Sequence, residues 1–170
     1  KDSRAAGHKG LQKVYETLAA NQDKYQALSS ASEFARALQS ARTVLQAEDM
    51  FSAPTIPQTT EARERYMAEN ISWLLAQAGP NAKIIVWAHN RHISTSYYAT
   101  GDSFTTRSMG SYLRERYGAA LVAFGFDFGF GPFNAPTIHG ECIATLSQHK
   151  IPAPTEATYE TTPHSANLPQ

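Results

Sequence analysis

The stretch Lys83-Ile84-Ile85-Val86-Trp87-Ala88-His89-Asn90-Arg91-His92 decides the fold class of this chain. Residues 83–88 form a nearly continuous apolar run rich in β-branched side chains, which is typical of a strand buried on both faces of a parallel sheet. The run ends abruptly at His89, where polar side chains begin. We therefore expect a buried strand over 83–88 that ends at His89.

Helices are predicted on the amino-terminal side of this strand. Apolar residues recur at helical spacing over 11–18, and the capping-box spacing Ser30-Ala31-Ser32-Glu33 starts a second helix. The two prolines within 51–60 predict a loop. A third helix is expected over 61–77, with Gly79-Pro80 as its terminator.

A further helix and strand are predicted on the carboxyl-terminal side. The helix covers about 109–116 and is closed by Gly118, and the apolar run 121–126 predicts a second buried strand. One more strand is expected within 138–146. This alternation of helix and strand indicates the α/β class, with a layered parallel or mixed sheet flanked by helices.

The chain divides into three predicted segments. Residues 1–50 form a helical, cap-like segment whose hairpin belongs to a helical insertion, 61–150 form the α/β catalytic half, and 151–170 form a polar tail. No internal repeat interrupts this order.

Composition excludes two classes of partner. Lys plus Arg and Asp plus Glu both count 15, so the formal net charge is zero. The chain therefore lacks the positive excess that nucleic acid or an anionic membrane requires, and no apolar run approaches the roughly 20 residues that span a bilayer. We expect no nucleic-acid and no membrane partner. The single cysteine, Cys142, excludes an internal disulfide but leaves a cytoplasmic and an exported location both open.

His89 and His92 are the main candidates for chemistry. In open α/β sheets, functional groups gather beyond the carboxyl ends of the strands, and His89 falls at that point. A histidine accepts or donates a proton near neutral pH, so two of them can divide these roles, with Asn90 as a supporting polar group. The alternative is that His89 only bonds to neighbouring backbone and that His92 is a solvated loop residue.

Two other catalytic chemistries have weaker signals. Zinc-ligand types occur at His89, His92, Asp127, His139, Glu141 and Cys142. No His-Glu-x-x-His helix and no Cys-x-x-Cys pair assembles them, so a metal-dependent hydrolase stays an alternative and we assign no metal. No Gly-x-Ser-x-Gly elbow occurs either, which disfavours a classical α/β-hydrolase.

Supporting roles are predicted on the third helix and among the aromatic residues. Arg63 and Glu64 lie on the helix that precedes the histidine-bearing strand, although a solvated charged face is the alternative. Tyr97 and Phe133 are candidates for lining an apolar substrate pocket, and packing in the core is the alternative for them.

Several short motifs stand out in order along the chain: Arg63-Glu64-Arg65-Tyr66-Met67-Ala68-Glu69-Asn70, Trp73-Leu74, Lys83 to His92, Met109-Gly110, Tyr117-Gly118, Phe124-Gly125-Phe126 and Gly131-Pro132-Phe133. In this order they resemble the erythromycin esterase family. The core Trp87-Ala88-His89-Asn90-Arg91-His92 is the specific part, and Glu64 stands where the family usually has an aspartate.

The resemblance implies hydrolysis of a carboxylic ester, a macrolide lactone in the best-known members, by a water that histidine activates without a metal or other cofactor. Family members are longer and carry an amino-terminal Gly-Glu-x-x-His-Gly-like motif with another catalytic histidine. His89 and His92 would then orient the substrate or assist proton transfer, while the remaining part of the same protein completes the site. The alternative from another class is a domain that binds a small molecule or carbohydrate without turning it over.

Overall fold

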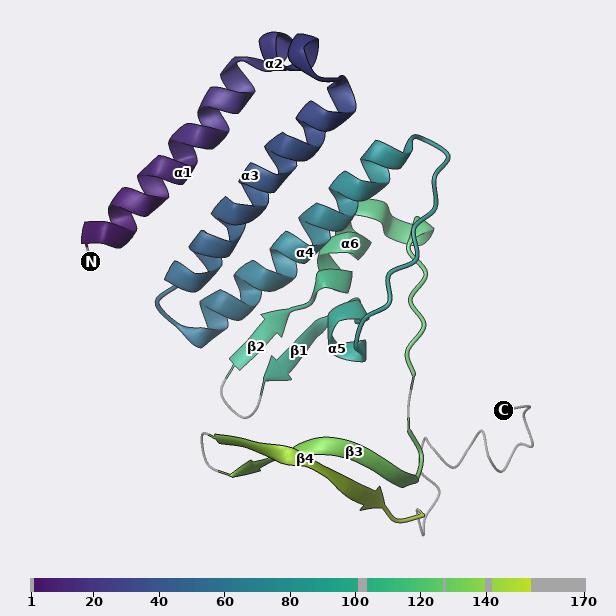
Figure 1. Ribbon diagram of the computed structural model, residues 1–170. Coiled ribbons are helices and arrows are strands. Elements are labelled where there is room, and N and C mark those ends of the chain that lie inside the picture. The colour runs from purple at the N-terminus through teal and green to yellow at the C-terminus, as the bar shows by residue number, and fades with distance from the viewer. Residues whose placement is uncertain (1, 101–103, 127, 140–141, 154–170) are drawn as a thin grey trace. The chain divides into compact units, whose positions relative to one another are not determined.

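The computed structural model describes residues 2–100, 104–126, 128–139 and 142–153. Residues 1–124 and 125–170 form two compact units, which are described separately. The first unit contains α1 (Asp2–Ala20), α2 (Gln22–Leu28), α3 (Ala31–Ser52), α4 (Ile56–Ala78), α5 (Asn90–Ile93), β1 (Tyr97–Thr100), β2 (Phe104–Arg107), α6 (Met109–Tyr117) and the 3₁₀ turn η1 (Gly118–Ala120) (Figure 1).

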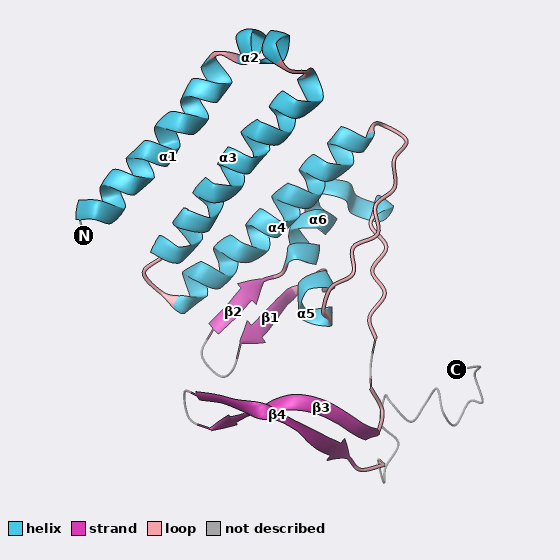
Figure 2. Cartoon of the chain, viewed as in Figure 1, coloured by secondary structure: helices cyan, strands magenta, loops and turns pink. Residues whose placement is uncertain are grey.

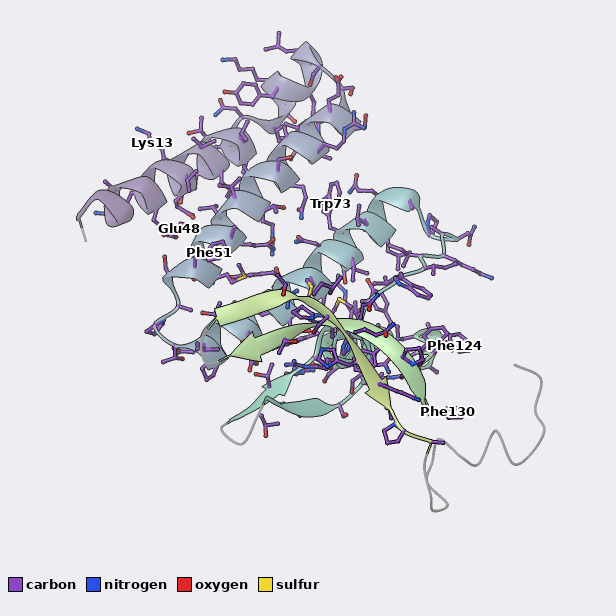
Figure 3. The ribbon with its side chains drawn as sticks, turned by 60° about the horizontal axis from the view of Figure 1, so that its bottom comes forward. Lys13, Glu48, Phe51, Trp73, Phe124 and Phe130 are labelled. Atoms are coloured by element: carbon purple, nitrogen blue, oxygen red, sulfur yellow. The ribbon has the colours of Figure 1, made fainter. Side chains whose placement is uncertain are left out.

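The amino-terminal helices confirm two sequence predictions. Helix α1 contains the predicted stretch 11–18 and begins earlier, and α3 begins after Ser30, whose Oγ accepts a hydrogen bond from the Glu33 N–H over 3.1 Å. The short helix α2 between them was not predicted. Helix α1 packs beside α3, and α3 beside α4 (Figure 1). Trp73 of α4, labelled in Figure 3, lines a groove. Phe34 and Leu38 of α3 line the same groove.

Helix α4 corrects the predicted loop over 51–60. The helix begins at Ile56, and Pro57 occupies its first turn. Proline is tolerated there because the first N–H groups of a helix have no intrahelical acceptor. Thr55 caps the helix by accepting a hydrogen bond from the Gln58 N–H over 3.4 Å. The predicted terminator is confirmed, since Gly79 follows α4 with a φ of 97°.

Residues 83–88 and 121–126 are not strands among the described residues, so the predicted parallel layered sheet is absent from this part of the chain. Val86 and Ala88 pack against the core, whereas Ile85 and Trp87 are 94% and 84% exposed. An apolar, β-branched run becomes a strand only where a neighbouring strand pairs with its backbone. No strand is assigned beside either segment in the described ranges, because the strands form two separate hairpins (Figure 2).

The strands that do form are antiparallel. β1 pairs with β2 in a register that runs from Tyr97 opposite Arg107 to Thr100 opposite Phe104. No strand was predicted between His92 and the helix that begins at about residue 109. Threonine and tyrosine favour strands, and that signal was missed. The described chain is therefore a mixed helical structure with small antiparallel sheets, which is compatible with the α/β class.

In the described residues of the second unit, β3 (Gly131–His139) and β4 (Cys142–Ile151) form a hairpin. The single strand predicted over 138–146 is wrong, because β3 ends at His139 and its antiparallel partner β4 begins at Cys142. The register of the hairpin is irregular between Pro136 and Ile138. Of the predicted polar tail, residues 154–170 lie outside the described residues. None of the described helices has a stretch both long and apolar enough to cross a bilayer.

The core that positions the site lies between α4 and α6. Ala68 of α4 and Met109 and Leu113 of α6 are buried together, with Met67, Ile71, Val86, Ala88, Ile93, Tyr112, Tyr117 and Leu121 packed around them. Met109 stands at the first position of α6. Segments 83–88 and 90–93 therefore rest on this core immediately before and after His89.

Candidate functional site

We call residues 89–93 the histidine turn. It begins at His89, which caps the short helix α5. Its extended backbone, with φ of −60° and ψ of 147°, places the Nδ1 atom 3.2 Å from the backbone N–H of Arg91, which donates to it. The His89 carbonyl oxygen in turn accepts from the His92 N–H over 2.8 Å. His89 thus stabilises the turn that carries His92. His89 itself is exposed to solvent.

His92 is held by Glu64. The Nδ1 atom of His92 lies 2.7 Å from Oε1 of Glu64, a residue in the middle of α4. The Glu64 side chain has no exposed surface, whereas 20% of the His92 side chain is exposed. A buried carboxylate is tolerated only when it is paired and hydrogen-bonded, because the interior solvates it poorly. The predicted supporting residue Glu64 is therefore in direct contact with His92.

The second oxygen of Glu64 anchors helix α6. Its Oε2 atom accepts a hydrogen bond from the backbone N–H of Met109 over 2.8 Å. That N–H is one of the first donors of α6, which have no acceptor within the helix. One carboxylate therefore joins α4, α5 and α6, and the position of His92 depends on all three elements.

Two small residues at the start of α6 contact the backbone at the end of the histidine turn. Ser108 caps α6 by accepting from the Ser111 N–H over 3.1 Å, and its Oγ atom lies 2.5 Å from the Ser94 carbonyl oxygen. A Cβ atom on Gly110 would lie 2.3 Å from the carbonyl oxygens of both Ile93 and Ser94. Only glycine permits this approach, so α6 packs directly on the backbone that follows His92.

Of the other predicted site residues, Arg63 and Asn90 belong to the elements that carry Glu64 and His92, whereas Tyr97 and Phe133 belong to β1 and β3. Arg63 is a half-exposed neighbour whose Nη1 atom is 4.0 Å from Glu64 Oε1, and Asn90 begins α5. Tyr97 is an exposed residue of β1, 62% accessible. Phe133 belongs to the second unit, where its ring stacks on His149 with centroids 5.5 Å apart. The roles predicted for Tyr97 and Phe133 in a substrate pocket stay predictions.

A cavity of about 510 Å³ opens one turn before Glu64, between the end of α3, the start of α4, β2 and α6. On its wall the Tyr112 hydroxyl donates to Glu61 Oε1 over 2.7 Å. The guanidinium of Arg107 lies 4.1 Å from the centroid of the Tyr112 ring. Burial, followed by the bond to Glu61, raises the pKa of Tyr112 to about 12. Sequence reasoning did not identify this cavity, and neither His89 nor His92 lines it.

Residues at the α6 start were also missed as part of the site. The sequence Ser108-Met109-Gly110-Ser111 carries a helix-cap signal, which is local and readable. The acceptor of the Met109 N–H and the neighbours of Gly110 come from α4 and α5, and no pattern near residue 108 specifies them.

The described side chains do not form a zinc-binding site. Among them, no three His, Cys, Asp or Glu residues lie close enough together to hold a metal ion. Asp127 and Glu141 lie outside the described residues, and so do the side chains of His139 and Cys142.

Comparisons with known proteins place this geometry in context. The whole chain, residues 1–170, matches the family model described as erythromycin esterase. A relative described as erythromycin esterase type I, from Escherichia coli, is 31% identical over 74 residues. That match covers 44% of this chain and 18% of the length of the relative. No solved structure matches the chain.

Proposed function

Because this chain belongs to the erythromycin esterase family, we propose that it supplies one part of the active site of a hydrolase that cleaves carboxylic esters. The observation that carries the proposal is the contact of His92 with the fully buried Glu64, on the same turn as His89. Burial of the Glu64 carboxylate costs free energy of folding. Packing alone does not account for it, because a hydrophobic pair of similar volume in its place often makes a fold as stable or more stable. A carboxylate that holds the Nδ1 side of a histidine is the arrangement that orients the catalytic imidazole in hydrolases with a Ser-His-Asp triad.

The proposed reaction has three demands. The oxygen of a water molecule attacks the ester carbonyl carbon, and a base takes a proton from that water. The bond between the carbonyl carbon and the alkoxide oxygen then breaks, and the alkoxide takes up a proton, which leaves a carboxylic acid and an alcohol. Stabilisation of the negative carbonyl oxygen is the third demand. The histidine turn serves these demands by orienting the ester and the water and by assisting proton transfer.

We propose that His89 and His92 act on one ester group. They are separated by three positions on a single helical turn, and one turn of helix rises about 5.4 Å. Asn90 lies between the two histidines on the turn, and Arg63 lies beside Glu64. Both are proposed to supply further polar groups for the substrate. No metal or other cofactor is part of this proposal.

The proposal includes a contribution from the rest of the protein. The match with the Escherichia coli relative covers 18% of that relative, so a complete protein of that kind has many further residues. We propose that these supply the principal base and also the neighbouring strands of a parallel sheet that includes 83–88 and 121–126. The alternation of packed Val86 and Ala88 with exposed Ile85 and Trp87 supports the second point, since it has the period of a strand.

The name of that relative suggests a substrate class. Erythromycin is a macrolide, so we propose a macrolide lactone or a related small ester as the substrate. A lactone is an intramolecular ester, and its hydrolysis opens the ring by the same bond changes.

The test is ester turnover by the complete protein, measured with macrolide lactones and with simple chromogenic esters. His89→Ala and His92→Ala should each lower kcat/KM by about 10²- to 10⁴-fold, as expected for loss of a group engaged in proton transfer or oxyanion stabilisation. The matched control is His8→Ala, because His8 lies on α1 and pairs with Glu48 away from the histidine turn. Unchanged turnover in both site variants would reject the proposal.

A further inference from the structure

The hydrogen bond at His89 determines which of its ring nitrogens carries the proton. A backbone N–H donates and never accepts, and the N–H of Arg91 points at Nδ1 of His89 over 3.2 Å. Nδ1 is therefore the acceptor. In the neutral ring the proton resides on the other nitrogen, so His89 presents an N–H donor at Nε2.

The contacts at His92 lead to the opposite result. An ionised carboxylate has only acceptor atoms, and Glu64 receives the Met109 N–H at Oε2 and faces Nδ1 of His92 with Oε1. Nδ1 of His92 therefore carries a proton, which it donates to Glu64. In the neutral ring Nε2 then has a free lone pair, so His92 presents an acceptor.

We infer that His89 and His92 are held in opposite tautomers, and that Glu64 is the positioning residue that fixes the tautomer of His92. The two rings therefore have different roles in the reaction. His89 donates its Nε2 proton in a hydrogen bond to the ester carbonyl oxygen, and His92 accepts a hydrogen bond from the attacking water at Nε2. These catalytic roles rest on the proposed function, whereas the tautomers themselves do not.

Glu64 suits this task because both of its oxygens are engaged in the buried interior. A glutamine at this position has one amide oxygen and one NH₂ group, so it cannot accept from Met109 and from His92 with separate oxygens. The amide oxygen is expected to face the buried Met109 N–H, and the NH₂ group then faces His92. A donor at that place converts Nδ1 to an acceptor and moves the His92 proton to Nε2. In Glu64→Asp both acceptors remain on a shorter side chain.

The first test is NMR of the complete protein with isotopically labelled histidine, at a pH where the rings are neutral. Long-range correlation of ring protons and nitrogens reports which nitrogen is protonated, and His89→Asn and His92→Asn assign the two signals. We expect Nε2–H for His89 and Nδ1–H for His92. The same tautomer in both rings, or Nε2–H in His92, would overturn the inference.

Glu64 itself is tested by substitution in the same experiment. Glu64→Gln should move His92 to Nε2–H, Glu64→Asp should keep Nδ1–H, and the control Glu61→Gln, one turn earlier on α4, should change neither ring. An unchanged His92 signal in a folded Glu64→Gln variant would remove Glu64 from this role. The wild-type spectrum decides the tautomers even if Glu64→Gln fails to fold.

Turnover by the complete protein separates the inference from the proposed function. Glu64→Gln should lower kcat by at least about tenfold, with a smaller change in KM, because the wrong tautomer affects the reaction more than substrate binding. Opposite tautomers in a protein that hydrolyses no ester would reject the function and keep the tautomers. Ester turnover with identical tautomers would keep the function and reject the inference.

Discussion

Glu64 accepts a 2.8 Å hydrogen bond from the backbone N–H of Met109, which lies 45 positions further along the chain. The same carboxylate contacts His92, so the start of α6 and the histidine turn share one buried anchor. Stability and activity are therefore expected to respond together when this anchor is disturbed.

Loss of the Glu64 carboxylate should lower the stability of the fold. Glu64→Ala leaves the Met109 N–H without its acceptor in a buried place, and an unsatisfied buried donor costs about 1 to 3 kcal/mol. The free energy of unfolding, measured by urea titration, should fall by at least this amount. Glu61→Ala, on the more exposed side of the same helix, should have a smaller effect. Equal effects of the two variants would contradict the anchoring role.

Two glycines should respond to alanine in opposite directions. Gly110→Ala places a Cβ atom 2.3 Å from backbone carbonyl oxygens, so the structure must shift and the variant should be destabilised by more than about 1 kcal/mol. Gly10→Ala on α1 has nothing within 4 Å of the new Cβ atom, and it should stabilise the helix by about 0.5 to 1 kcal/mol. Thermal unfolding followed by circular dichroism measures both. A Gly110→Ala variant as stable as wild type would show that α6 does not pack closely on the histidine turn.

The two serine caps should differ in their contribution. Ser30→Ala removes an exposed N-cap and should cost about 1 kcal/mol. Ser108→Ala removes an N-cap that is fully buried and that also contacts the carbonyl oxygens of Ser94 and Ser96, so it should cost about 2 kcal/mol or more. Denaturant unfolding of the two variants provides the comparison, and an equal or smaller loss for Ser108→Ala would contradict the buried contacts.

Tyr112 should make stability depend on pH in the alkaline range. Its pKa rises from 10.0 to about 12 in the folded chain, mainly because of burial and then because of the bond to Glu61. The unfolded chain therefore loses this proton first, so the contribution of Tyr112 is fully present below pH 10 and is lost as the pH rises toward 12. Ultraviolet difference titration of wild type against Tyr112→Phe should show one phenol ionising near the upper end of this window. Ionisation of Tyr112 near its ordinary pKa would contradict the buried environment.

The features that the sequence predicted correctly are helix ends, which depend on a few neighbouring residues. The structure confirms the Ser30 cap of α3 and the glycines Gly79 and Gly118 that follow α4 and α6. Pro57 misled the prediction only because proline in the first turn of a helix resembles proline in a loop.

Non-local relationships could not be predicted in the same way. The runs 83–88 and 121–126 have strand composition, but strand formation depends on a pairing partner that composition does not specify. Glu64 was predicted as a supporting residue, yet its contact with His92 crosses 28 positions and its contact with Met109 crosses 45. The close approach that requires glycine at 110 depends on the carbonyl oxygens of Ile93 and Ser94, at the end of α5.

A double-mutant cycle between Glu64 and His92 tests the central claim most directly. The quantity is kcat/KM for ester hydrolysis by the complete protein in wild type, Glu64→Gln, His92→Ala and the double variant. If Glu64 acts through His92, the double variant should be no slower than His92→Ala alone, because the second substitution has nothing left to disturb. If the two losses multiply, or if His92→Ala turns over esters at the wild-type rate, the account of this site is contradicted.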